Sequence, residues 1–132
     1  ELGRGKKLKN GTDIAVLSLG YMAKNVTEAI EKLDHPQRAA HYALRFVKPL
    51  DQEMLHEVFS TYEKVFVVED GAMAGGCGSA VLEFAAAYSY KTPVVLIGIP
   101  DRFIEQGTVS ELQENAGISV DKIFETVNLH FK

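Results

Sequence analysis

The 132-residue chain is long enough for one domain with its own core and too short for two. Its composition, 46 % hydrophobic and 24 % charged, excludes intrinsic disorder, and a formal charge of −4 argues against nucleic acid or an anionic membrane surface as a partner. A single cysteine cannot form an internal disulfide, and no signal peptide or membrane-spanning run is visible, so we expect a cytoplasmic protein.

The first part of the sequence predicts two strands and a helix. Asn10-Gly11 separates residues 5–9 from the apolar run at residues 14–18, and this dipeptide favours the type I′ turn of a hairpin. We therefore expect these two strands to pair antiparallel with each other. Apolar residues then recur at helical spacing from Val26 until the sequence Asp34-His35-Pro36 ends the helix.

The remainder of the chain predicts an alternation of strands and helices. Two apolar runs, residues 65–68 and 94–97, are typical of strands that are buried on both faces of a sheet. Asp51 and Ser119 are expected to cap the helices that follow them, and residues 79–88 are expected to form a further helix. The other expected features are a strand at residues 40–47, a buried helix face of Met54, Leu55, Val58, Phe59 and Tyr62, a capping box at residues 108–111 closed by Gly117, and a final apolar face of Val120, Ile123, Phe124, Val127 and Phe131.

This order of elements predicts an α/β fold. Strands that alternate with helices favour a three-layer α/β/α open sheet of about five strands. The sheet is expected to be mostly parallel, with one antiparallel edge strand formed by the start of the chain.

The segment that joins the strand at residues 65–68 to the next helix is rich in glycine, and it reads Glu69-Asp70-Gly71-Ala72-Met73-Ala74-Gly75-Gly76-Cys77-Gly78-Ser79. Such turns bind phosphate in nucleotide-binding proteins. Here neither the dinucleotide fingerprint nor a Gly-Lys-Ser/Thr sequence follows, and the two acidic residues would repel an anion. We interpret the glycines as permitting a tight turn and close packing of the helix, with a phosphate or small-ligand site as the alternative.

No other group of residues forms a recognisable catalytic or metal site. Adjacent strand residues point to opposite faces, so we expect Asp70 to cap the turn rather than to share acid–base chemistry with Glu69. Cys77 has no histidine near it in the sequence and is interpreted as a small residue of the turn. The histidines lack the spacing of metal ligands, and we expect each to lie at the surface or at a helix end. They are His35, His41, His56 and His130.

Three segments together carry a resemblance to a known family. Residues 44–51, Leu-Arg-Phe-Val-Lys-Pro-Leu-Asp, and the turn at residues 68–79 resemble two strand-to-helix joints of the transketolase C-terminal domain superfamily, which includes pyruvate dehydrogenase beta subunits. Residues 98–107, Gly-Ile-Pro-Asp-Arg-Phe-Ile-Glu-Gln-Gly, are similar to the 1-deoxy-D-xylulose 5-phosphate synthase family, as are residues 108–118 and 8–17. The resemblance covers nearly the whole chain.

The resemblance implies that residues 1–132 are a single transketolase C-terminal-like domain and a fragment of a larger chain. Enzymes of this family condense pyruvate with glyceraldehyde 3-phosphate, with loss of CO2, in non-mevalonate isoprenoid and thiamine biosynthesis. Their thiamine diphosphate and Mg2+ lie between two earlier domains, and Asp70-Gly71 lacks the rest of the Gly-Asp-Gly metal motif. The resemblance therefore assigns no catalytic, cofactor-binding or metal residue to this chain, which is expected to be inactive alone.

The resemblance instead implies that this domain makes contacts. Its partners would be the cofactor-binding domains of the same chain and a second subunit of a homodimer. Arg45 and Arg102 follow strands at the edge where open sheets meet partners, and an arginine suits a carboxylate; a surface pair of Arg102 with Asp101 or Glu105 is the alternative. The candidate contact residues are Arg45, Asp70, Gly75, Gly76, Gly78, Asp101 and Arg102. Two other functions stay open: an autonomous small-ligand or regulatory domain that uses residues 71–79, and the C-terminal domain of another thiamine-dependent enzyme, a transketolase or a pyruvate dehydrogenase beta subunit.

Overall fold

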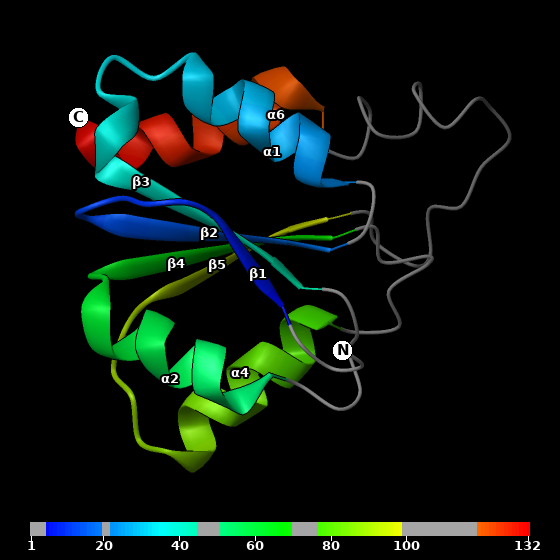
Figure 1. Ribbon diagram of the computed structural model, residues 1–132, viewed down its shortest axis with the longest axis vertical. Coiled ribbons are helices and arrows are strands. Elements are labelled where there is room, and N and C mark those ends of the chain that lie inside the picture. Colours follow the sequence, from blue (N-terminus) through cyan, green and yellow to red (C-terminus); the bar gives the residue numbers. More distant parts are fainter. Residues whose placement is uncertain (1–4, 20–21, 45–50, 70–76, 99–118) are drawn as a thin grey trace, which may run out of the picture.

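The computed structural model describes residues 5–19, 22–44, 51–69, 77–98 and 119–132. Five strands form one sheet in the order β1-β3-β2-β4-β5. Strands β2 to β5 run parallel, and β1 is the antiparallel strand at one edge. Helices cover both faces of the sheet (Figure 1). The predicted three-layer α/β/α sheet with one antiparallel edge strand is confirmed.

The helices and strands follow the predicted order along the chain. The strands are β1 Lys6–Lys9, β2 Ile14–Leu19, β3 Ala39–Leu44, β4 Lys64–Glu69 and β5 Val94–Gly98. The helices are α1 Met22–Glu31, α2 Gln52–Thr61, α4 Cys77–Ala87 and α6 Val120–Asn128, and short 3-10 helices lie at Pro36–Arg38 (η1) and Leu129–Phe131 (η3).

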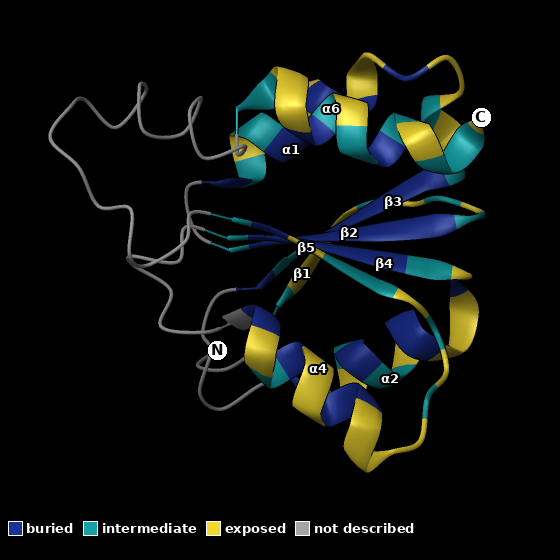
Figure 2. Cartoon of the chain, turned by 180° about the vertical axis from the view of Figure 1, so that it is seen from behind, coloured by how far each residue is buried: buried dark blue, intermediate teal, exposed yellow. Residues whose placement is uncertain are grey.

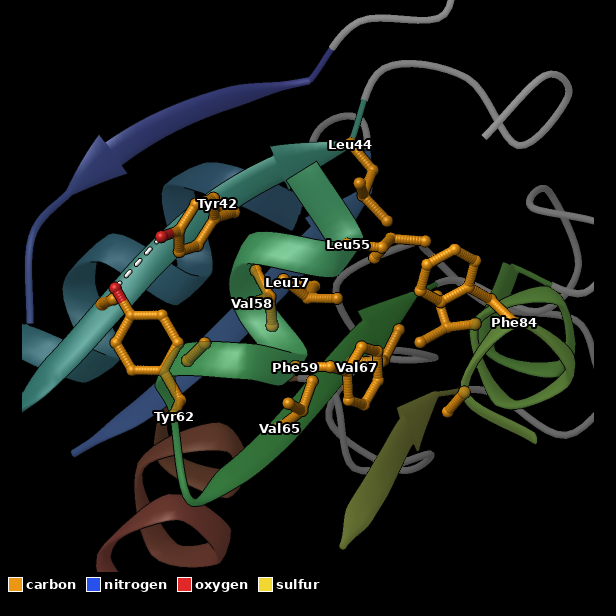
Figure 3. Packing of buried hydrophobic residues seen from close by; sticks show 14 residues of the cluster. Leu17, Tyr42, Leu44, Leu55, Val58, Phe59, Tyr62, Val65, Val67 and Phe84 are labelled. Atoms are coloured by element: carbon orange, nitrogen blue, oxygen red, sulfur yellow. Dashed lines mark hydrogen bonds between the residues drawn. The ribbon is translucent and has the colours of Figure 1, made fainter. Parts of the chain in front are cut away.

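Two hydrophobic cores fill the space between the sheet and its helices. Alternate residues of each strand point to opposite faces, so Ile14 and Val16 of β2 contribute to the core under α1 and α6, and Ala15 and Leu17 to the core over α2 and α4. Figure 3 shows the second core, in which side chains of α2 and α4 meet those of the central strands. Burial on both faces explains the apolar run in β4.

The predicted helix caps are confirmed. Asp51 Oδ1 accepts a hydrogen bond from the Met54 N–H at 3.1 Å, and Ser119 Oγ accepts one from the Lys122 N–H at 3.3 Å. The apolar face of α6 packs against the first core as expected, with Ile123 buried at its centre. The predicted capping box and Gly117 lie outside the described residues.

The predicted hairpin between residues 5–9 and 14–18 is wrong. β1 pairs with β3 instead, and residues 10–13 cross the amino end of β3 to reach β2. A Cβ atom on Gly11 would lie 2.2 Å from the backbone nitrogen of Ala40, so an alanine would force one of the two backbone segments to move. Glycine is therefore required here for the close crossing of two backbone segments, whereas the sequence suggested a tight turn.

The prediction that residues 94–97 are buried on both faces is also wrong. β5 is the outer strand beside β4, and the side chain of Leu96 is 46 % exposed while that of Ile97 is buried. A run of apolar residues indicates which side chains favour burial, but the described residues do not supply that burial for Leu96.

Candidate functional site

The carboxyl ends of the parallel strands lie along one edge of the sheet, which we call the carboxyl edge. The chain leaves the strands there at Leu19, Leu44, Glu69 and Gly98. Open α/β sheets meet ligands and partners at this edge. Of the predicted contact residues the structure describes Gly78, and the others lie outside the described residues: Arg45, Asp70, Gly75, Gly76, Asp101 and Arg102.

The start of the described chain arrives at the same edge. Because β1 is antiparallel to β3, its first residue, Lys6, pairs with Ala43, next to the carboxyl end of β3. Gly5 therefore lies at the carboxyl edge, where its N–H donates a hydrogen bond to Asp51 Oδ2 at 2.8 Å. Figure 1 shows the start of β1 at the end of the sheet where the parallel strands finish, and Figure 2 shows the same arrangement from behind.

Asp51 has a second role that the sequence did not suggest. One carboxylate oxygen caps α2 at Met54, and the other holds the N–H of Gly5, 46 positions away in the sequence. Asp51 as a whole is only 7 % exposed, and both bonds are partly buried. A helix cap can be recognised from local sequence, but a bond to so distant a residue gives no local signal.

The start of α4 is packed tightly against the ends of β4 and β5. Glu69 Oε1 accepts the N–H of Gly78 at 2.8 Å, and a Cβ atom on Gly78 would lie 2.6 Å from that oxygen and 2.9 Å from Leu96 Cδ2. A Cβ atom on Gly98 would lie 2.7 Å from the carbonyl oxygen of Glu69. Gly78 is thus in close contact with Glu69 and Leu96, in each case with the end of a flexible side chain. A phosphate at this helix start would have to displace the Glu69 carboxylate.

A pocket of about 310 Å³ opens beside α2 and β1. Three carboxylates and one ammonium group contribute to its lining, which consists of Gly5, Lys7, Tyr42, Asp51, Glu53, Met54 and Glu57. Glu57 Oε2 accepts the Tyr42 hydroxyl at 2.6 Å and lies 3.1 Å from Lys7 Nζ. The Tyr42 hydroxyl also contacts that of Tyr62 at 3.0 Å (Figure 3).

The hydrogen bonds and the ion pair around Tyr42 and Glu57 stabilise the fold and are not suited to catalysis. The hydrogen bond from Tyr42, followed by the contact with Lys7, holds the pKa of Glu57 below its usual range. Burial, with the hydrogen bonds to Glu57 and Tyr62, raises the pKa of Tyr42 well above its ordinary value. Near neutral pH Glu57 is therefore a poor proton acceptor and Tyr42 a poor proton donor, so neither suits acid–base catalysis.

The expectation that every histidine lies at the surface or a helix end is wrong for His41. This residue of β3 is 1 % exposed, and its Nε2 lies 2.8 Å from Ser18 Oγ while its Nδ1 lies 3.4 Å from Thr27 Oγ1 of α1. Burial, with the nearby charge of Lys9, lowers the pKa of His41 to about 4. Ser18 and His41 resemble a nucleophile and its base, but both are buried beyond the reach of a substrate. They form a polar link between β2, β3 and α1.

The remaining histidines make ordinary structural contacts. The Nδ1 of His56 lies 2.7 Å from the Tyr90 hydroxyl, and the Nε2 of His130 lies 2.8 Å from Glu63 Oε2. His35 is exposed and precedes η1. In the part of the chain that the structure describes, no three histidine, cysteine, aspartate or glutamate side chains are placed to hold a metal ion. The same residues contain no helix long and apolar enough to cross a membrane.

Comparison with known proteins identifies close sequence relatives. The family model "Transketolase, C-terminal domain" matches residues 3–123. The chain is 47 % identical to the 1-deoxy-D-xylulose-5-phosphate synthase of Bacteroides thetaiotaomicron over 124 residues, 92 % of this chain and 19 % of that protein. It is 45 % identical to the synthase of Cytophaga hutchinsonii over 127 residues, 96 % of this chain and 20 % of that protein. The chain thus spans about a fifth of these relatives, and the match is to their C-terminal part.

Solved structures agree with the sequence comparison. A split-gene transketolase, described as an inactive beta4 tetramer, superposes on this chain with a TM-score of 0.84 at 32 % identity. The superposition covers 96 % of this chain and 42 % of the transketolase chain. The transketolase of Campylobacter jejuni superposes with a TM-score of 0.61 at 16 % identity, over 95 % of this chain and 18 % of that one, and so supports the fold alone.

Proposed function

Because this chain belongs to the transketolase C-terminal domain family, we propose that it serves as the C-terminal docking domain of a 1-deoxy-D-xylulose 5-phosphate synthase. It is homologous to the C-terminal part of these synthases. The full-length protein would condense pyruvate with glyceraldehyde 3-phosphate, with loss of CO2, for isoprenoid and thiamine biosynthesis in the cytoplasm. Within it, residues 1–132 would make contacts between domains and subunits and would carry no catalytic group.

The observation that carries the proposal is the position of Gly5. The described chain begins at the carboxyl edge, so the part of a longer protein that precedes residue 5 would be joined to the domain at this edge. The segments that hold the candidate contact residues leave the strands at the same edge. We therefore propose that this edge faces the preceding domains and that Arg45, Asp70, Asp101 and Arg102 bind them, together with the glycine turn.

The described residues do not fit thiamine diphosphate and Mg2+. The N–H of Gly78, which would face a diphosphate at the start of α4, is already bonded to Glu69, whose negative charge would repel the ligand. No group of carboxylates in the described part of the chain is placed for a metal ion. In our proposal the preceding domains hold both groups, and no step of the reaction passes through this chain.

Association with other subunits forms the second part of the proposal. The matched split-gene transketolase assembles as a β4 tetramer, which supports a role for this type of domain in subunit contacts. We propose a homodimer of the full-length protein, to which the domain contributes contacts. Sedimentation velocity of the full-length protein would measure this state, and a monomer at assay concentrations would contradict it.

The experiment that tests the function compares the full-length protein with the 132-residue chain. Each would be assayed with pyruvate, glyceraldehyde 3-phosphate, thiamine diphosphate and Mg2+. We expect CO2 release and product only from the full-length protein. Turnover by the 132-residue chain would contradict the proposal, and a full-length protein that acts only on other thiamine-dependent substrates would assign the domain to another enzyme of the superfamily.

Calorimetry of the 132-residue chain tests the remaining alternative. The chain would be titrated with thiamine diphosphate, with nucleotides and with sugar phosphates. We expect no heat of binding, because Glu69 already occupies the start of α4. Saturable binding that is lost when Gly78 is replaced would instead indicate a ligand-binding domain that uses the glycine turn.

A further inference from the structure

Helix α4 differs from the other helices in the side chains that it exposes. The exposed residues of α1, α2 and α6 are all polar or charged, as expected of solvated helix faces. Those of α4 are mainly apolar: Ser79, Leu82, Glu83, Ala86 and Ala87. Figure 2 shows exposed residues, in yellow, on the side of α4 that faces away from the sheet. A helix that is apolar on all sides is typically buried on all sides. The outer side of α4 therefore has the composition of an interface.

The exposed side chain of Leu96 extends this apolar surface onto the sheet. Leu96 reaches the start of α4, because its Cδ2 would lie only 2.9 Å from a Cβ atom on Gly78. Leu82 lies one helical turn beyond Gly78 on the same side of α4. Leu82 is 41 % exposed and Leu96 is 46 % exposed. We call the surface made of Leu82, Glu83, Ala86 and Leu96 the α4 face.

The charge on this surface argues against a second copy of the domain as its partner. Glu83 is exposed beside Leu82, and no ion pair to it is found among the described residues. A two-fold interface centred on the α4 face would bring Glu83 close to its own copy, and like charges at such a contact oppose association. A partner with a basic side chain opposite Glu83 would instead gain a favourable contact.

The position of the α4 face favours the preceding part of the same polypeptide. α4 begins at the carboxyl edge, where the N-terminal end of the described chain also lies. Gly5 precedes β1, which is the first strand of the sheet, and β5 is the last. Four strand spacings of ~4.8 Å put these two strands about 19 Å apart across the sheet. A preceding domain of ordinary size spans this width, since a 100-residue domain has a radius of gyration of about 13 Å. The relatives are five times longer than the match, so such a domain is present in them.

We propose that in the full-length protein the α4 face is buried against the domain that precedes residue 5 in the same polypeptide. That domain supplies an apolar surface to Leu82, Ala86 and Leu96, and a lysine or arginine opposite Glu83. The inference rests on the proposed function, because it requires the chain to be the C-terminal part of a longer protein. What it adds to the proposed function is the surface, the α4 face, through which the domain docks onto the preceding domain.

The test measures the accessibility of single cysteines to a maleimide reagent. Leu82→Cys is introduced in a Cys77→Ser background, both in the 132-residue chain and in the full-length protein. Leu129→Cys is the matched control, because Leu129 is 70 % exposed and lies in η3, next to the amino ends of the strands. Circular dichroism confirms that each variant retains the fold.

We expect Leu82→Cys to react about tenfold or more slowly in the full-length protein than in the 132-residue chain, because an interface protects it. Leu129→Cys should react equally fast in both. Equal rates for Leu82→Cys in the two proteins would contradict the proposal, as would equal slowing of both cysteines. Slowing of Leu82→Cys in the 132-residue chain as its concentration rises would identify a second copy as the occupant and overturn the assignment.

A charge reversal tests the proposed basic partner. Adding Glu83→Lys to Leu82→Cys should restore fast labelling in the full-length protein, whereas Glu28→Lys on α1 should leave the labelling slow. An unchanged rate with Glu83→Lys would contradict the basic group opposite Glu83. The labelling does not depend on turnover, so a full-length protein without synthase activity would contradict the proposed function and leave this result intact.

Discussion

Asp51 and Gly5, 46 positions apart in the sequence, are joined by a hydrogen bond of 2.8 Å from the Gly5 N–H to Asp51 Oδ2. The same carboxylate begins α2 through its bond to Met54. One side chain thus fixes both the start of a core helix and the point where the chain reaches the carboxyl edge.

Replacing Asp51 should reveal these two roles separately. Asp51→Ala removes the helix cap and the bond to Gly5, and we expect it to lower the free energy of unfolding by about 2–3 kcal/mol. Asp51→Ser can keep the cap but cannot reach Gly5, so its loss should be about 1 kcal/mol. Urea unfolding of the 132-residue chain, followed by circular dichroism, measures both values. A loss near zero for Asp51→Ser would show that the bond to Gly5 contributes nothing, and equal losses for the two variants would show that the cap contributes nothing.

Three glycines should tolerate alanine to different extents, because their neighbours differ. The Cβ of Gly11→Ala would meet the backbone nitrogen of Ala40, and that of Gly98→Ala the backbone oxygen of Glu69; neither atom can move easily, so we expect losses of about 1–3 kcal/mol. The Cβ of Gly78→Ala would meet only the ends of flexible side chains, and alanine favours a helix by about 1 kcal/mol. Gly78→Ala should therefore be close to neutral. Unfolding free energies give the order, and a Gly78→Ala loss larger than that of Gly11→Ala would contradict the packing described here.

The buried His41 should make the domain less stable in mild acid. Its pKa is about 4 in the folded chain and 6.5 when unfolded, so the unfolded chain binds a proton first as the pH falls. Stability is then lost from about pH 6.5 down to about pH 4, and the loss between pH 7 and pH 5 should be about 2 kcal/mol. The lowered pKa of Asp13 acts only at lower pH, because carboxylates titrate below this window.

The measurement for His41 is the free energy of unfolding of the 132-residue chain at pH 7 and at pH 5. We expect His41→Gln to remove most of the difference between the two values, whatever its effect at pH 7. His35→Gln is the control, because His35 is exposed, and it should leave the difference intact. A wild-type difference that persists in His41→Gln would assign the pH dependence to another group.

Ser89 offers a site for stabilisation. It follows α4 with a φ of 62°, and the bond from Tyr90 N to Ala85 O closes the helix end around it. Glycine adopts this conformation without the cost that a side chain carries, so Ser89→Gly should raise the free energy of unfolding by about 0.5–1 kcal/mol. Ala86→Gly, inside the same helix, should lower it by a similar amount. Thermal unfolding compares the two, and a Ser89→Gly variant that is less stable than wild type would contradict the account.

Most of the fold could be predicted because its signals are local. Apolar spacing located the helices and strands, and the caps at Asp51 and Ser119 use residues three positions away. The pairing of β1 could not be predicted in this way. Asn10-Gly11 carries the signal of a hairpin turn, whereas the need for glycine at Gly11 comes from β3, about thirty residues later in the chain.

The candidate site was harder to predict for the same reason. The burial of His41 depends on α1 covering β3, and the second role of Asp51 depends on the antiparallel course of β1. The exposure of Leu96 shows a further limit. Its apolar neighbours predicted burial on both faces, yet Leu96 is 46 % exposed, and our proposal for the α4 face assigns its burial to the preceding domain.

If the domain contributes contacts and no chemistry, as we propose, it should bind the rest of the full-length protein and restore its activity. The 132-residue chain would be titrated by calorimetry into the remainder of the full-length protein, produced separately with thiamine diphosphate and Mg2+. The account predicts a saturable one-to-one complex that regains synthase turnover, although neither part is active alone. Two results together would contradict the proposal: full turnover by the remainder alone, and no heat of binding when the 132-residue chain is added.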